Sequence, residues 1–343
     1  MIRYAIRGAT LADEGDLCAL AHHLNTVNLP DDPAHVRDIL DLSVRSFSGT
    51  IKDPRRREYV FVIEDVTERR VIGSSKVIAQ LGRRDAPYIF LDVVKEEKYS
   101  ATIDRHFVHT VLKIGYSYDG PTEIGGLIML PESRRGPEKL GMMISYVRFL
   151  FMAIHRGLFR NDVVAELLPP LEPDGRSHLW EALGRHFTGM TYLEADLLSK
   201  KNKEFIKALF PSGDIYASLL RPEARDVIGK VGRETRGVEK LLRRIGFQYC
   251  NRIDPFDGGP HFRAVTDEIL LIKRTRRLRV RDVRSNVEGP RSLVAVEVKD
   301  APFFRCVGRP AIAYSDDTCT IDRHAAEFLG TEAGAGLALL PLD

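Results

Sequence analysis

Residues 127–158 read LIMLPESRRGPEKLGMMISYVRFLFMAIHRGL, a short apolar run followed by a basic turn and a long amphipathic segment. The run 127–130 predicts a buried strand, and Pro131 ends it because proline has no N–H to donate to a neighbouring strand. From Met142 onward, apolar residues recur at three- and four-residue steps, which predicts a helix. The stretch therefore predicts a strand, a turn and a helix in immediate succession.

The turn between this strand and helix has the composition of an anion site. Arg134, Arg135 and Lys139 supply positive charge, while Gly136 and Gly141 allow the backbone to approach a ligand closely. The N-terminus of the helix adds free N–H groups and the positive end of the helix dipole. The sequence thus predicts a pyrophosphate site here. The alternative is an ordinary strand–turn–helix unit whose arginines are merely solvated.

The composition is typical of a soluble globular protein, with 44% hydrophobic and 29% charged residues in a chain of 343. A net charge of +3 gives no strong field for nucleic acid or an anionic membrane. The basic cluster at 273–284 has no interleaved aromatic residues for base stacking. No apolar run could cross a bilayer, and the N-terminus lacks the apolar stretch of a signal peptide. We therefore expect a cytoplasmic protein that binds neither nucleic acid nor membrane.

The cysteines suggest neither a disulfide framework nor a zinc site, because they lie far apart without a CxxC pair. They are Cys18, Cys250, Cys306 and Cys319. We expect structural thiols and no bound metal.

The rest of the chain alternates helical and strand-like patterns. Helices are predicted after Thr10, near 34–47, at 178–187 and at 238–246, and strands at 58–64, 71–80 and 162–167. The strands at 58–64 and 71–80 read as a hairpin. Residues 84–122 show strand character only at 88–94, and residues 292–343 read as short strands.

Several separated motifs occur in a fixed order along the chain. They are YVFVIED at 59–65, VIG at 71–73, RFLF at 148–151, VVAE at 163–166, LGRHF at 183–187, FIKALFP at 205–211, DVIGKV at 226–231, GFQY at 246–249 and DPFDGGP at 254–260. Together with the turn at 134–141, this series resembles the arginine N-succinyltransferase family of GNAT-like acyl-CoA N-acyltransferases. The resemblance runs from about Ile6 to about Lys273.

The resemblance implies an α/β (α+β) fold. A GNAT-like domain with a mixed sheet flanked by helices would span 1–265, and a small β-rich C-terminal domain would span 266–343. It implies transfer of a succinyl group from succinyl-CoA to the α-amine of L-arginine, in arginine catabolism, by an oligomeric enzyme without metal. It places an acyl-CoA contact at Leu127, and the cofactor-binding set is Leu127, Arg134, Arg135, Lys139, Gly141 and Met142.

One departure from the family concerns proton transfer. The family's catalytic histidine directly follows the Ile-Gly-x-Val motif, and in this chain DVIGKV is followed by Gly232. His186 and Glu166 are the candidates to take over, and His178 and His261 also lie near family motifs. His186 could instead be structural, and Glu166 could hold a guanidinium or ammonium group or simply anchor a loop.

Asp257 fits a turn-forming role better than a catalytic one, because Asp-Gly is a strong turn signal.

Two rival functions stay open at this point. The first is an acyltransferase with a different acyl donor or amine, such as ornithine. The second is a non-catalytic CoA-binding or regulatory protein that lost the family's histidine.

Overall fold

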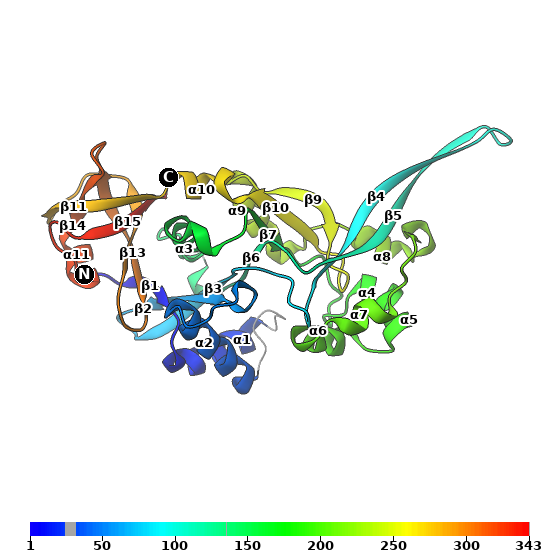
Figure 1. The fold of residues 1–343 in the computed structure, drawn as a ribbon, viewed down its shortest axis with the longest axis horizontal. Helices are drawn as coiled ribbons and strands as arrows, with labels where there is room; N and C mark the ends of the chain where they lie inside the picture. Colours follow the sequence, from blue (N-terminus) through cyan, green and yellow to red (C-terminus); the bar gives the residue numbers. More distant parts are fainter. Residues whose placement is uncertain (25–31, 135, 343) are drawn as a thin grey trace. The chain divides into compact units, whose positions relative to one another are not determined.

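The computed structural model describes residues 1–24, 32–134 and 136–342. Two compact units make up the chain, and each is assembled from separate stretches of sequence (Figure 1). The first unit comprises Met1–Gln80, Thr122–Asn161 and Thr266–Asp343, and the second comprises Leu81–Pro121 and Asp162–Val265. Each unit is described by itself.

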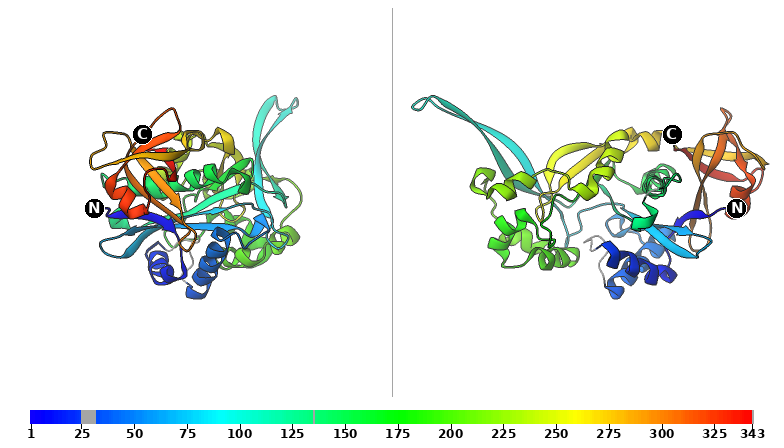
Figure 2. Two further views of the ribbon diagram at one scale, coloured as in Figure 1. Left: turned by 60° about the vertical axis from the view of Figure 1, so that its left-hand side comes forward. Right: turned by 180° about the vertical axis from the view of Figure 1, so that it is seen from behind.

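The first unit contains a row of hydrogen-bonded strands that ends in a barrel. Their order is β12 (Arg291–Glu297), β15 (Gly336–Pro341), β11 (Arg276–Arg284), β14 (Thr318–Asp322), β13 (Phe304–Ala313), β1 (Tyr4–Gly8), β2 (Glu58–Asp65), β3 (Arg70–Ile78) and β6 (Thr122–Met129). Because β12 also pairs with β13, the five C-terminal strands close on themselves (Figure 2). This barrel confirms the β-rich character expected for the C-terminal region.

The helices of the first unit follow local sequence signals. They are α1 (Glu14–Leu24), α2 (Pro33–Phe47), α3 (Leu140–Ile154), α10 (Leu270–Arg274) and α11 (Arg323–Leu329). Helix α2 begins with Pro33 at its first position, and the Asp32 carboxylate accepts the N–H of Ala34. Its buried Ser43 accepts the Val60 N–H through Oγ at 2.9 Å, which fixes the helix on β2.

Most of the elements predicted for this unit are confirmed. Strand β6 contains residues 127–129 of the predicted run and ends at Met129, one residue earlier than predicted, and α3 begins two residues before Met142. Strands β2 and β3 form the expected antiparallel hairpin. The basic cluster at 273–284 contains the whole of β11, where Leu278 and Val280 are buried between exposed arginines.

The second unit has its own sheet and helices. Its strands lie in the order β7 (Asp162–Glu166), β10 (Pro260–Val265), β9 (Gln248–Ile253), β4 (Tyr88–Ser100), β5 (Arg105–Ser117) and β8 (Ile215–Tyr216). Its helices are α4 (His178–Ala182), α5 (Gly184–Thr188), α6 (Tyr192–Lys201), α7 (Glu204–Leu209), α8 (Pro222–Val227) and α9 (Arg236–Arg244). A separate apolar core forms around Trp180, which stacks on Phe256 at a centroid distance of 5.1 Å.

Two predictions for the second unit need correction. The single helix predicted at 178–187 is two short helices, because the backbone leaves helical geometry at Leu183 and Gly184 packs against the Trp180 ring. The strand predicted at 88–94 is far longer. It continues to Ser100 and pairs along its whole length with β5, which the sequence did not predict.

The units are groupings by spatial proximity. The division expected from the sequence, at 1–265 and 266–343, stays a prediction, although the chain does pass between the two units at 265/266. Among the described helices, none combines the length and apolar composition needed to cross a membrane.

Candidate active site

Strand β6 carries a bulge at the residue predicted to contact the acyl group. Ser74 pairs with Ile128 and Lys76 pairs with Gly125, so Gly126 and Leu127 together lie opposite Ser75. Gly126 has a φ of +55°, and an added Cβ would lie 3.0 Å from the Lys76 side chain, so glycine suits this position. The bulge interrupts the regular ladder beside the half-buried Leu127.

Helix α3 is held beside this bulge by two side-chain hydrogen bonds. Ser75 Oγ donates to the Ile144 carbonyl at 2.7 Å, and Arg148 Nη1 donates to the Gly125 carbonyl at 3.3 Å. Arg148 is buried and also donates to Ser145, and burial lowers its pKa to about 9. These bonds give Arg148 a role in positioning α3 against β6.

The N-terminus of α3 offers two backbone donors. Lys139 precedes the helix in the left-handed region, with a φ of +50°. Its carbonyl accepts the N–H groups of Met142 at 2.9 Å and of Met143 at 3.1 Å. Within the described residues, the N–H groups of Leu140 and Gly141 have no acceptor. An anion at this end of α3 would therefore meet these two donors, whereas the N–H of Met142 is already engaged.

Arg134 and Lys139, two basic residues of the turn, lie at the surface. Arg134 Nε donates to the Met129 carbonyl at 3.1 Å, which anchors the guanidinium at the end of β6. Glu132 and Glu138 are acidic neighbours in the same turn, so the positive field is weaker than the basic residues alone suggest. The remaining predicted contact, Arg135, lies outside the described residues.

In the second unit, a buried histidine and two carboxylates come together. His261 and Glu166 are direct partners across β10 and β7. His261 is fully buried, and its Nδ1 lies 2.9 Å from the Tyr88 hydroxyl. Its Nε2 lies 3.6 Å from Glu166 Oε1 and has no hydrogen-bond partner among the described residues. With a carboxylate oxygen of Asp254, these ligand atoms lie within 4.8 Å of one another.

The electrostatics of this cluster favour a cationic ligand. Burial lowers the pKa of His261 to about 4, although the charge of Asp254 opposes the shift, so the imidazole is neutral near pH 7. The Glu166–His261 contact is therefore no ion pair, and at 3.6 Å it is too long for a hydrogen bond. Burial also raises the pKa of Tyr88, which keeps its hydroxyl protonated. The Glu166 side chain is 30% exposed, which leaves the carboxylate accessible to a ligand.

The same donors could hold a divalent cation, because two carboxylates and an imidazole are common ligands of such ions. The expected absence of a metal therefore stays a prediction.

The other candidate residues lie apart from this cluster. His186 is exposed on the short helix α5, and His178 Nδ1 lies 3.4 Å from Glu172 Oε1. Arg185 forms an ion pair with Glu181. The role of His186 in proton transfer stays a prediction, without a described contact to Glu166 or His261.

Asp257 has the environment of a turn former. Its Oδ1 accepts the Gly259 N–H at 2.7 Å, and Gly258 adopts a φ of +84°. Burial raises the pKa of Asp257, and Tyr192 donates to its Oδ2 at 3.4 Å. These contacts support the structural role expected from its Asp-Gly sequence.

Gly232, at the position of the family's histidine, lies against the segment that follows Glu166. Its N–H donates to the Leu168 carbonyl at 2.8 Å, and an added Cβ would lie 2.6 Å from the Pro169 oxygen. Any side chain at 232 would thus collide with backbone in this chain. The family's proton-donor position and Glu166 consequently share one neighbourhood.

Sequence reasoning named Glu166 and His261 separately but missed Tyr88 and Asp254. Glu166 ends the VVAE motif, and Asp254 begins the DPFDGGP motif that His261 directly follows. The position of these residues in or beside two family motifs was the sequence signal that could have grouped them. Tyr88 carried no such signal, because it lies 173 residues from His261 along the chain.

Residues 4–271 match the sequence profile of a family described as arginine N-succinyltransferase beta subunit. The chain belongs to the arginine N-succinyltransferase family. This finding confirms the resemblance inferred from the motifs and assigns the chain to a family of acyltransferases.

Relatives in this family align over nearly the whole chain. The arginine N-succinyltransferase of Yersinia pestis is 30% identical over 98% of this chain and 97% of its own length. The arginine N-succinyltransferase subunit beta of Pseudomonas aeruginosa is 30% identical, with 98% of each chain covered. The solved structure of arginine/ornithine succinyltransferase subunit AI from Pseudomonas aeruginosa has a TM-score of 0.85 and 27% identity, with both chains covered completely. The mixed α/β fold class is therefore confirmed.

Proposed function

We propose that this chain transfers a succinyl group from succinyl-CoA to the α-amine of L-arginine, as an enzyme of arginine catabolism. Membership of the arginine N-succinyltransferase family over almost the full chain carries this proposal. A cytoplasmic location remains part of it.

The acyl donor would be held by elements of the first unit. The N–H groups of Leu140 and Gly141, together with Arg134, Arg135 and Lys139, would face the pyrophosphate. Backbone groups at the β6 bulge beside Leu127 would polarise the thioester carbonyl, where negative charge develops during attack.

The amine would be held by the Glu166–Asp254–His261 cluster of the second unit. Arginine arrives with its α-amine protonated, and a site with two carboxylates attracts that ammonium group. Glu166 is the exposed member of the cluster and would take one proton, while the neutral His261 beside it leaves the negative charge of the carboxylate intact. His186 stays a second candidate for this proton transfer.

Succinyl transfer requires the freed amine to attack the thioester carbon, and the carbon–sulfur bond breaks as the tetrahedral intermediate collapses. The CoA thiolate takes the proton that Glu166 accepted from the ammonium and leaves as the thiol. The nitrogen then loses its second proton to the regenerated Glu166 carboxylate, which releases it to solvent, and the amide is complete.

Release of free thiol tests the substrates. Succinyl-CoA and acetyl-CoA are each offered with arginine, ornithine or lysine. We expect rapid arginine-dependent release from succinyl-CoA alone. Preference for ornithine would support the rival amine, and the name of the solved Pseudomonas aeruginosa relative includes that substrate. Absence of thiol release with every pair of substrates, while CoA still binds, would support a non-catalytic CoA-binding protein.

Glu166→Gln tests the amine site. We expect kcat/KM for arginine to fall about 100-fold or more, as removal of a general base does, with CoA affinity unchanged. Glu223→Gln is the matched control, because Glu223 is exposed in the same unit. Equal activity of the Glu166→Gln variant and the wild type would exclude this carboxylate from proton transfer.

A further inference from the structure

His261 has a buried ring nitrogen that no hydrogen bond satisfies. The side chain is 0% exposed, and its Nε2 has no hydrogen-bond partner among the described residues. Glu166 Oε1, at 3.6 Å, is too far away to form a hydrogen bond with it. Buried polar atoms of native proteins nearly always have a partner, and a bound ion is one explanation for an atom without one. This nitrogen, which lies beside a carboxylate, therefore points to a cationic ligand.

The spacing of the donor atoms around this nitrogen fits one metal ion. One donor atom each from Glu166, Asp254 and His261 lies within 4.8 Å of the other two. Bonds of about 2.1 Å to a tetrahedral zinc ion separate two ligand atoms by roughly 3.4 Å. The observed 3.6 Å between His261 Nε2 and Glu166 Oε1 is close to this separation. A distance that is too long for a hydrogen bond therefore suits two ligands of the same ion.

Contacts outside the cluster hold two of the three donors in place. His261 Nδ1 lies 2.9 Å from the Tyr88 hydroxyl, and metal-binding imidazoles usually donate their second ring N–H to such a partner. This arrangement leaves the lone pair of Nε2 for the ion. Asp254 Oδ1 accepts the N–H groups of Phe256 at 2.7 Å and of Asp257 at 3.3 Å, which fixes that carboxylate. The donors are thus positioned by the protein itself.

The charges around the cluster also suit a cation. Burial lowers the pKa of His261, which leaves the imidazole neutral near pH 7, and the neutral form is the metal ligand. Lys203 and Arg252 are the cations that act on this pKa, and Arg252 is itself paired with Asp92 at 2.9 Å. The Glu166 side chain is 30% exposed, which gives an ion access from solvent.

We propose that Glu166, Asp254 and His261 form an inhibitory site for a divalent transition-metal ion, with Zn²⁺ as its type. A buried imidazole beside two carboxylates selects ions that accept nitrogen as well as oxygen. Mg²⁺ and Ca²⁺ take oxygen ligands and should bind far more weakly. Three protein ligands leave the fourth position of a tetrahedral ion for water.

The effect of the ion on activity rests on the proposed function. The Glu166 carboxylate that would hold the ammonium group of arginine is also a ligand of the ion, so both cannot occupy it together. Zn²⁺ should therefore raise the KM for arginine. The KM for succinyl-CoA should stay unchanged, because the residues proposed to hold that substrate lie in the first unit. The ion is thus a regulator of the reaction and not a cofactor.

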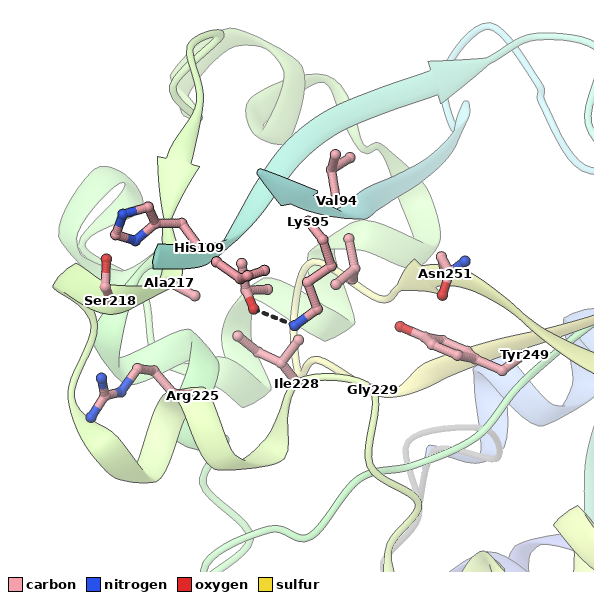
Figure 3. Close-up of a pocket in the computed structure, with 13 residues that line it drawn as sticks. Val94, Lys95, His109, Ala217, Ser218, Arg225, Ile228, Gly229, Tyr249 and Asn251 are labelled. Carbon is pink, nitrogen blue, oxygen red and sulfur yellow. Dashed lines mark hydrogen bonds between the residues drawn. The ribbon is translucent and has the colours of Figure 1, made fainter. Parts of the chain in front are cut away.

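A groove of about 700 Å³ in the same unit provides a contrast (Figure 3). His109 lines it together with Lys95 and Arg225, and its described lining contains no carboxylate. Lys95 donates to the Thr110 hydroxyl at 2.7 Å. His109 lacks the anionic ligands that surround His261, so it is a matched control histidine.

Binding of Zn²⁺ to the full chain tests the site. Isothermal titration calorimetry after dialysis against a chelator should give one ion per chain. Glu166→Gln and Asp254→Asn should each weaken the affinity at least about tenfold, because one of three ligands is lost. Tyr88→Phe should weaken it about tenfold, as removal of an outer partner of a metal-binding imidazole does. His109→Gln should bind like the wild type.

A wild type that binds no Zn²⁺, or a Glu166→Gln or Asp254→Asn variant that binds it as tightly as the wild type, would overturn the proposal. Cys250→Ser separates this site from a thiolate site, because Cys250 Sγ lies 3.2 Å from the His261 carbonyl oxygen. Loss of Zn²⁺ binding in Cys250→Ser with binding retained in Glu166→Gln would assign the ion to the cysteine and overturn the proposal.

Initial rates with and without Zn²⁺ test the inhibition. They are followed by loss of the thioester, because Zn²⁺ also binds the thiol product. A raised KM for arginine alone is the expected result, and competition with succinyl-CoA instead would overturn the inhibitory role. Zn²⁺ binding at the cluster in a protein that does not acylate arginine would support the metal site and count against the proposed function alone.

Discussion

At the scale of single residues, His261 combines complete burial with a neighbouring carboxylate. Burial disfavours the imidazolium, while the charges of Asp254 and Asp92 favour it, and the desolvation effect is the larger one. The His261 side chain is thus neutral near pH 7 and does not neutralise the charge of the neighbouring Glu166. The cluster keeps its negative charge for an incoming ammonium group.

The depressed pKa of His261 predicts a pH dependence of stability. Its pKa is about 4 in the folded protein against 6.5 in the unfolded chain. Between pH 6.5 and pH 4, His261 binds a proton in the unfolded chain but not in the folded protein. The free energy of unfolding should therefore fall as the pH drops from 6.5 to 4. The full loss would be about 3 kcal/mol.

Urea unfolding at pH 7 and pH 5 measures this effect. The loss of stability between the two values should be smaller in His261→Gln than in the wild type. His106→Gln is the control, because this histidine is exposed on β5. An identical pH dependence of stability in the wild type and His261→Gln would show that protonation of His261 does not cause the loss of stability.

Gly232 supports a second prediction at this scale. Because an added Cβ would lie 2.6 Å from the Pro169 oxygen, Gly232→Ala should lower the free energy of unfolding by about 1–3 kcal/mol. Gly232→His should destabilise further and should not raise turnover. Thermal unfolding measures the loss, with Gly157→Ala as the control, because nothing lies within 4 Å of a Cβ there. Unchanged stability together with higher activity in Gly232→His would contradict this prediction. It would show that residues 168–169 move enough to accommodate a histidine side chain at position 232.

At the scale of elements, β6 and α3 were predictable because a proline and a strong helical periodicity delimit them within one short stretch. Strand β4 was not predictable beyond 88–94. Residues 95–98 read Lys-Glu-Glu-Lys, which lacks the apolar alternation of a half-buried strand. Its strand structure comes from cross-strand pairing with β5.

The candidate site was predictable only in part, for a similar reason. Glu166 and the turn residues stand in local motifs, so the sequence could point to them. The contact between Tyr88 and His261 joins distant parts of the chain and exists only after β4, β9 and β10 have assembled. Local patterns carry no information about such a pair.

The N-terminus of α3 gives the prediction at this scale. Arg134→Ala together with Lys139→Ala should weaken CoA binding about tenfold and reduce its dependence on salt, because two exposed cations near the phosphates are lost. Isothermal titration calorimetry at low and moderate salt measures both effects. Arg55→Ala together with Arg56→Ala is the control, since these cations lie in another turn of the same unit. Equal CoA affinity in the Arg134/Lys139 variant and the wild type would show that these two side chains do not contribute to CoA binding.

At the scale of the whole molecule, the chain passes between its two units four times, at 80/81, 121/122, 161/162 and 265/266. The C-terminal barrel is also continuous with the N-terminal strand. Strand β13 pairs with β1, where Ala5 lies opposite Val307 and Ile6 opposite Cys306. Ile2 and Ala5 belong to the same apolar core as the barrel strands. The barrel therefore completes the first unit.

This arrangement predicts the result of cutting the chain at the expected domain boundary. A protein ending at residue 265 would lose β13, one of the two strands that pair with β1, and would expose Ile2 and Ala5. We expect it to be insoluble, or soluble without a cooperative unfolding transition. Co-expression of residues 266–343 as a separate chain should restore solubility, because β13 can then pair with β1. A soluble 1–265 fragment that unfolds cooperatively and binds CoA like the full chain would instead establish 1–265 and 266–343 as independent domains.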